Sequence, residues 1–194
     1  MENEILKDSF CPTSKEDWRK WLEKNHIEKD SIWLILHKKS SDKPSISWSD
    51  TVDVALCYGW IDSTKKTLDN ERYTQYYGKR KAKSTWSKIN KDKVEVLKKQ
   101  NLMKPAGLEC IKVAKENGSW SILDEVENLE IPVELDEKFK TNPDANAFYL
   151  NLSKSKRKSL LQWIVMAKRP ETKTKRINEI VELAGNGLIP KQFR

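Results

Sequence analysis

Apolar residues recur at helical spacing near the start of the chain, and an uninterrupted apolar run follows. Trp18, Trp21 and Leu22 lie three and four residues apart, which places their side chains on one face of an α-helix. Ser14 precedes them and can cap the first free amide groups of that helix. The apolar run at residues 32–36 has the length of a strand, and its lack of alternation predicts a central strand covered on both faces.

The next segment has the pattern of a helix followed by a hairpin. Ser47 is a candidate cap for the helix, and Gly59 is expected to end it because glycine accepts the left-handed conformation common at helix ends. Residues 60–68 and 72–77 are rich in β-favouring side chains, and turn-forming residues separate them. These two segments therefore predict an antiparallel hairpin.

Two further helices are predicted after the hairpin. Ser84 and Ser87 are the candidate caps of the first one. Pro105 suits the first turn of the second helix, where its missing N–H removes no hydrogen bond. We expect Leu108 on the buried face of that second helix.

The remaining chain follows an acidic segment at residues 124–137, and its apolar patterns are all helical. Ser153 and Thr172 are the predicted starts of the last two helices. The order of elements predicts an α+β fold with a small antiparallel sheet and flanking helices, followed by an all-helical C-terminal module. The expected domains are residues 1–123 and 124–194.

Composition restricts the class of protein. The chain has 194 residues, of which 37% are hydrophobic and 34% are charged, as expected for a soluble globular protein. Its apolar runs are too short for a membrane span, and its polar N-terminus lacks the layout of a signal peptide. We therefore expect a cytoplasmic protein.

The residues that usually carry catalysis or bind metals are scattered. Cys11, Cys57 and Cys110 are widely spaced, which argues against a disulfide framework or a cysteine metal site. His26 and His37 stand apart, without acidic or sulfur partners at ligand spacing. The chain also lacks the common nucleophile, phosphate-loop and zinc motifs. The sequence thus predicts no catalytic residue, metal or cofactor.

Positive charge concentrates in and after the predicted hairpin. The net charge is +8, and residues 72–104 hold eleven lysines and arginines against two acids. Such a segment is either a solvated surface or a face that attracts an anionic partner. Cations interleaved with aromatic rings suit nucleic acid in particular. The candidate binding residues are Arg72, Tyr73, Tyr76, Tyr77, Lys79, Arg80, Lys81 and Lys83.

A second hypothesis places a pocket near Trp60, Asp62 and Trp86, which would hold a small anionic ligand or serve an enzyme. Two of these residues also have structural interpretations, Trp86 as a core residue and Asp62 as a strand-end acid paired with a lysine. The burial of the tyrosines and arginines distinguishes the two hypotheses. Exposed tyrosines along a basic face favour nucleic acid, whereas a concave pocket with one buried arginine favours a small anion.

Four runs together resemble a known family, the YdeI/OmpD-associated family, named also for bacteriocin protection. They are ALCYGWIDS (residues 55–63), KSTWSKIN (83–90), NLMKPAGL (101–108) and WIVMAKRPETKTKRI (163–177). The resemblance implies a YjbR/CyaY-like domain followed by a helical module, and a role in stress or antimicrobial-peptide tolerance. We therefore expect a non-enzymatic binding protein for an anionic partner, with nucleic acid favoured over a small ligand.

Overall fold

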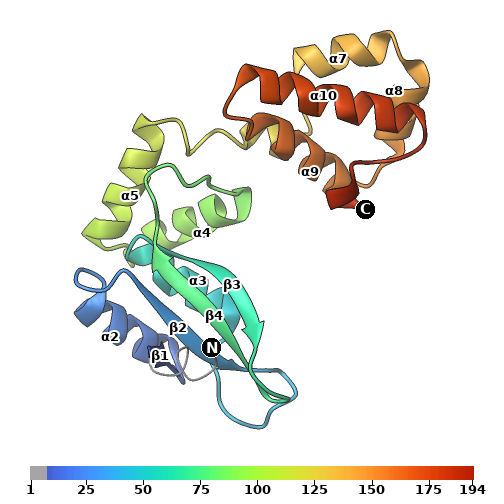
Figure 1. Cartoon of the computed structure of the whole chain (residues 1–194). Coiled ribbons are helices and arrows are strands. Elements are labelled where there is room, and N and C mark those ends of the chain that lie inside the picture. The colour runs from blue at the N-terminus through green and yellow to red at the C-terminus, as the bar shows by residue number, and fades with distance from the viewer. Residues whose placement is uncertain (1–7) are drawn as a thin grey trace. The chain divides into compact units, whose positions relative to one another are not determined.

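The computed structural model describes residues 8–194, which divide into two compact units (Figure 1). The first unit extends to Trp120, and the second runs from Ser121 to Arg194. The first unit combines a small sheet with helices, whereas the second contains helices only. The predicted α+β fold with a helical C-terminal region is confirmed.

The sheet of the first unit has four strands in the order β1-β2-β4-β3. They are β1 (Ser9–Phe10), β2 (Ser31–His37), β3 (Trp60–Thr67) and β4 (Arg72–Lys79). β4 pairs antiparallel with both β2 and β3, so the predicted hairpin is present. β1 pairs parallel with β2, which makes the sheet mixed. The sequence did not predict β1, because two residues are too few to show a period.

Serine caps begin three of the helices in this unit, as expected. Ser14 and Ser47 each accept the amide hydrogen three residues on, at 3.1 Å, and Ser87 does so at 3.3 Å. Ser84 caps nothing, since its helix begins after Ser87. The helices are α2 (Lys15–Asn25), α3 (Trp48–Cys57), α4 (Lys88–Lys99) and α5 (Pro105–Glu116).

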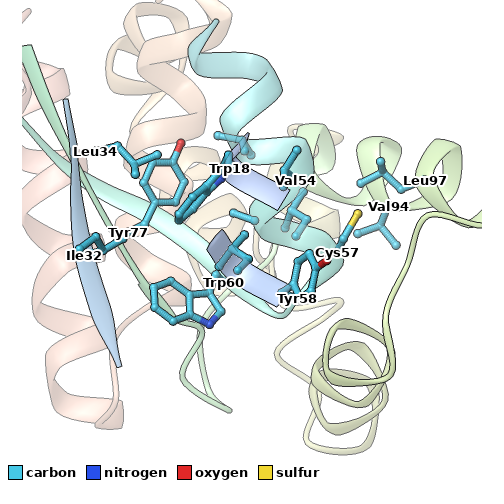
Figure 2. Close-up of a cluster of buried hydrophobic side chains, with 14 of the residues drawn as sticks. Trp18, Ile32, Leu34, Val54, Cys57, Tyr58, Trp60, Tyr77, Val94 and Leu97 are labelled. Atoms are coloured by element: carbon cyan, nitrogen blue, oxygen red, sulfur yellow. The ribbon is translucent and has the colours of Figure 1, made fainter. Parts of the chain in front are cut away.

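The core of the first unit lies between one face of the sheet and these helices (Figure 2). Trp18 of α2 meets Tyr77 of β4 edge to face, with ring centroids 5.5 Å apart. Both polar ends are satisfied by Thr51 of α3, whose carbonyl accepts from the indole at 3.0 Å and whose hydroxyl lies 2.6 Å from the phenol. The buried rings therefore need no contact with water.

The opposite face of the sheet is only partly covered. Ile35 is 8% exposed, but Trp33 is half-buried and meets Tyr76 edge to face at 4.9 Å. The amine of Lys66 lies 5.0 Å from the centroid of the Trp33 ring. The prediction that β2 is covered on both faces is therefore correct for Ile35 and wrong for Trp33.

α5 approaches the end of α3 unusually closely, because Gly107 has no side chain. A Cβ at this position would lie 2.3 Å from the carbonyl oxygen of Cys57. Gly107, Ile111 and Ala114 are buried at helical spacing, so the packed face starts one residue earlier than expected. Leu108 falls outside this face and is 46% exposed, which corrects its predicted burial.

The second unit has its own core, built from the apolar faces of its helices. Pro170 occupies the first turn of the last helix, so that helix starts before the predicted Thr172. Ser153 caps the preceding helix, as predicted. No helix within residues 8–194 is long and apolar enough to cross a membrane. The elements are α6 (Asp124–Glu127), α7 (Val133–Lys140), α8 (Pro143–Asn151), α9 (Lys154–Val165), α10 (Pro170–Gly185) and the 3₁₀ turn η1 (Lys191–Phe193).

Candidate functional site

A pocket of about 770 Å³ lies in the first unit, beside the first residue of β3 and the last of β4. The end of α2, the turn after α3 and one side of α5 complete its wall. Much of the lining is apolar, from Ile27, Trp60, Pro105, Ala106 and Val113. The volume is in the range of small-molecule sites.

Main-chain hydrogen bonds hold these segments together. The Arg80 amide donates to the Gly59 carbonyl at 2.9 Å, and the Lys104 amide donates to the Cys57 carbonyl at 3.0 Å. Gly59 has a φ of +73°, and a Cβ there would lie 3.0 Å from the Ala106 carbonyl oxygen. Glycine is thus required here both for the left-handed conformation and for the close approach of α5.

Arg80 is the charged residue of this wall that lacks an acidic partner. Its guanidinium stacks on Trp86, with Cζ 3.7 Å from the ring centroid, and its Nη2 donates to the Thr85 carbonyl. Nε and Nη1 are buried and have no hydrogen-bond partner within residues 8–194. Burial lowers the pKa of Arg80 to about 10, because the charged form has lost its hydration.

Trp60 adds a third unpaired donor to the same wall. It is 1% exposed, and its Nε1 has no acceptor in the described part of the chain. A buried donor without an acceptor costs about 1–3 kcal/mol, so native structures rarely keep one without a reason. All three atoms belong to residues that line one pocket, but the atoms themselves lie beneath its surface.

The cations at the mouth of the pocket are already paired. The Lys79 amine donates to the Ile27 carbonyl at 2.8 Å and to Asp30 at 2.9 Å. The Lys104 amine lies 3.1 Å from Glu23, which also accepts the Tyr58 hydroxyl. The Tyr58 hydrogen bond, followed by Lys104, lowers the pKa of Glu23 and keeps it ionised.

The aromatic residues predicted to bind nucleic acid lie mostly in the core. Tyr77 and Trp86 are 0% and 1% exposed, and Tyr73 is 9% exposed. A buried ring cannot stack on a base, so these three are not surface platforms. Tyr76 is half-buried on the other face of the sheet.

The predicted basic residues do not form one cluster. Arg72 begins β4, where it pairs with Asp69 at 2.7 Å, and Arg80 follows the other end of that strand. Lys81 and Lys83 are exposed on the loop after β4. The structure thus separates one half-buried arginine from its solvated neighbours.

Asp62 does not line this pocket. Its Oδ2 accepts the indole N–H of Trp48 at 2.9 Å and lies 3.4 Å from the side-chain nitrogen of Gln75. The expected pairing of Asp62 with a lysine is therefore replaced by a contact with an indole. Of the predicted trio, Trp60 lines the pocket and Trp86 lies under Arg80.

Sequence reasoning missed the residues that α2 and α5 supply. Glu23, Lys104 and Cys110 line the pocket, yet they belong to separate segments that only the fold brings together. Burial raises the pKa of the Cys110 thiol, although the Arg80 charge opposes this shift. Within residues 8–194, histidine, cysteine and acidic side chains form no group of three that could hold a metal ion.

Comparison with known families divides the chain in two. Residues 10–110, just over half of the chain, match the model of the family described as Domain of unknown function (DUF8412). The chain belongs to this family. Residues 128–187 match a second family model, described as Bacteriocin-protection, YdeI or OmpD-Associated.

These matches confirm part of the resemblance noted from the sequence. Within the second unit of this DUF8412 protein, the region of similarity is to the YdeI/OmpD-associated family model. The expected YjbR/CyaY-like character of the first unit is not confirmed, because DUF8412 is the family that matches there. No curated protein and no solved structure matches the chain.

Proposed function

We propose that the first unit binds a small organic anion, with an apolar body and one carboxylate, in the pocket beside Arg80. The observation that supports this proposal is Arg80, a half-buried cation in the wall of a largely apolar pocket, without an acidic partner within residues 8–194. Its Nε and Nη1 lie beneath the pocket surface without an acceptor, so a small shift of the side chain toward an anion would satisfy a charged donor.

The character of the wall indicates the kind of anion. Lys79 and Lys104 are balanced by Asp30 and Glu23, which leaves Arg80 as the cation for a ligand to neutralise. One uncompensated charge suits a monoanion rather than a polyphosphate. The apolar side chains around it suit a hydrocarbon or aromatic body.

Nucleic acid, which the sequence favoured, fits the geometry less well. The tyrosines that would stack on bases are largely buried, and the two arginines lie at opposite ends of β4. A concave pocket with one buried arginine is the arrangement that distinguishes a small-anion site from a nucleic-acid face.

Calorimetric titration of the full chain with benzoate, phenylpropionate and 3-methylbutanoate tests the proposal, with the corresponding primary amides as neutral controls. We expect at least one acid to bind and its amide to bind much more weakly. Arg80→Met should weaken that acid by about tenfold or more, the usual effect of removing a charge-assisted hydrogen bond. Lys81→Met removes an adjacent exposed charge and should change the affinity less than about twofold.

Equal losses of affinity in Arg80→Met and Lys81→Met would show that the charge which attracts the acid does not come from the pocket. Labelled oligonucleotides test the competing hypothesis in the same buffers at about 50 and 200 mM salt, since backbone binding weakens steeply over that range. Salt-sensitive binding that Lys81→Ala and Lys83→Ala abolish would replace the small anion with nucleic acid.

A role in protection against bacteriocins is a second proposal, and the family match at residues 128–187 is the observation that favours it. Expression of the full chain in a bacteriocin-sensitive bacterium should raise survival in the presence of the toxin. Unchanged survival would exclude this role. Loss of protection in Arg80→Met would connect the role to the pocket of the first unit.

A further inference from the structure

We propose that the first unit has a second ligand site, for a phosphorylated small molecule with a planar ring, at the other end of the hairpin. A hollow of about 570 Å³ lies there between the end of β2, the loop at residues 38–47, the start of α3 and the β3–β4 pair. The sites are separated along β3, because Trp60 lines one and Lys65 and Thr67 line the other.

The wall of this second pocket is cationic. Its lining includes Lys38, Lys39, Lys43 and Lys65, and no aspartate or glutamate from residues 8–194. This differs from the first pocket, whose mouth contains acids that balance its lysines. Four amines around one hollow favour a ligand with several negative charges, which describes a di- or triphosphate better than a monocarboxylate.

Of these four lysines, Lys43 alone has an acidic partner within 4 Å in the part of the chain that the structure describes. Glu71 lies 3.8 Å from the Lys43 amine, and both side chains are more than half exposed, so the pair is weak. Lys38 donates to the main-chain carbonyl of Asp69, not to its carboxylate. The Lys65 amine lies 4.1 Å from the centroid of the Tyr73 ring, which orients it without neutralising it.

Trp48 provides a flat surface in the same wall. It is 49% exposed although its side chain is large and apolar, and it is the first residue of α3. Its indole N–H donates to Asp62 at 2.9 Å, which fixes the ring at the pocket. A fixed and exposed indole beside several amines is the combination that holds an aromatic ring carrying phosphates.

His37 adds an imidazole to the same wall. Its Nδ1 is buried and has no hydrogen-bond partner in the described part of the chain, and the residue lines the pocket. The hollow has the volume of a small-molecule site, whereas a nucleic-acid duplex would rest on the surface outside it. These observations together point to a nucleotide-like ligand and do not depend on the function proposed for the first pocket.

Calorimetric titration of the full chain with three probes tests this site: tripolyphosphate, adenosine triphosphate and adenosine. We expect tripolyphosphate to bind, adenosine triphosphate to bind more tightly, and adenosine to give no heat. Trp48→Ala should weaken adenosine triphosphate by about tenfold, the scale of a lost stacking contact, and leave tripolyphosphate unchanged.

The double variant Lys39→Met with Lys65→Met should weaken both phosphates by about tenfold or more. Lys66→Met is the matched control, because Lys66 follows Lys65 in β3 but lies over Trp33 on the opposite face. Circular dichroism establishes that each variant is folded.

Three outcomes of these titrations would overturn the inference. They are no binding of either phosphate, an equal loss of affinity in Lys66→Met, and a loss of affinity in Arg80→Met, which would place the ligand in the first pocket. Oligonucleotides that bind more tightly than adenosine triphosphate and lose binding in the same lysine variant would also overturn it, in favour of a nucleic-acid surface. Binding of phosphates without binding of carboxylates would leave this site intact while refuting the function proposed for the other.

Discussion

The guanidinium of Arg80 lies over the indole of Trp86, with 3.7 Å between Cζ and the ring centroid. Trp86 is 1% exposed, so its ring belongs to the core. Because the guanidinium of Arg80 stacks on this ring, part of its surface is removed from water. The stack recovers part of the lost hydration energy, but it supplies no acceptor for Nε and Nη1. A charge held in this way has lost part of its hydration, and its unpaired nitrogens would reach an anion in the pocket only if the side chain moved.

Replacing this charge should leave the stability of the unliganded protein almost unchanged. The fall in the Arg80 pKa from 12.5 to about 10 corresponds to about 3 kcal/mol of disfavoured charge. The stack on Trp86 and the hydrogen bond to the Thr85 carbonyl together return an amount of similar size. Arg80→Met should therefore change the free energy of unfolding by less than about 1 kcal/mol in urea titrations. A loss of 2 kcal/mol or more would show that the arginine is structural and would weaken the case for a ligand.

Alkaline pH should destabilise the first unit through Tyr77. Burial raises the pKa of this phenol, whereas the unfolded chain ionises tyrosine near pH 10. Above that pH the folded state binds more protons than the unfolded state, so stability falls by up to about 1.4 kcal/mol per pH unit for this group.

Tyr77→Phe tests that assignment. At pH 8 the free energy of unfolding of the variant should be about 1 kcal/mol lower than that of the parent, in which the phenol still contacts Thr51. It should then lose less stability than the parent between pH 10 and 11. Parallel stability curves for the two proteins across this interval would contradict the prediction.

Gly107→Ala should separate α5 from α3. The added Cβ would lie 2.3 Å from a main-chain oxygen, which cannot rotate away as a side chain does. We expect the free energy of unfolding to fall by at least about 3 kcal/mol, which is the upper range for overpacking. Gly185→Ala is the matched control, because Gly185 also lies in a helix but has no atom within 4 Å of the added Cβ. That change should leave the stability within about 1 kcal/mol of the parent or raise it.

The two serines before α4 provide a test of helix capping. Ser87→Ala removes the oxygen that accepts the Asn90 amide and should cost about 1 kcal/mol. Ser84→Ala makes the same chemical change in a residue that caps no helix, and its effect should stay within about 0.5 kcal/mol. Chemical denaturation of both variants measures the difference. Equal effects would show that the cap contributes nothing.

Local patterns were sufficient to predict most elements of the first unit. The serine caps, the apolar run of β2 and the turn between β3 and β4 are each encoded within a few neighbouring residues, and each is present. The alternation of side chains along a strand puts Tyr73 and Tyr77 on one face of β4 and Tyr76 on the other, as observed. It could not indicate which face the helices cover, because that depends on residues distant in the sequence.

The candidate site was less accessible to such reasoning. Arg80 and Lys81 are adjacent cations on one loop, so the sequence alone gives no reason to expect different environments for them. Only the position of Trp86 and the approach of α5 make the first buried and leave the second in water. The second pocket was missed for a related reason, since the lysines of the loop at residues 38–47 face Lys65 only after β2 and β3 are joined through β4.

The close contact of α5 with the end of α3 also bears on how this family can diversify. At Gly59 and Gly107 the spacing is fixed by main-chain atoms, so it does not depend on which side chains occupy the pocket. Ala82, Ala106 and Val113 line the wall, and their side chains are not among the nearest atoms at the two glycines. Relatives that keep both glycines could therefore vary the shape of the pocket on the same main-chain frame.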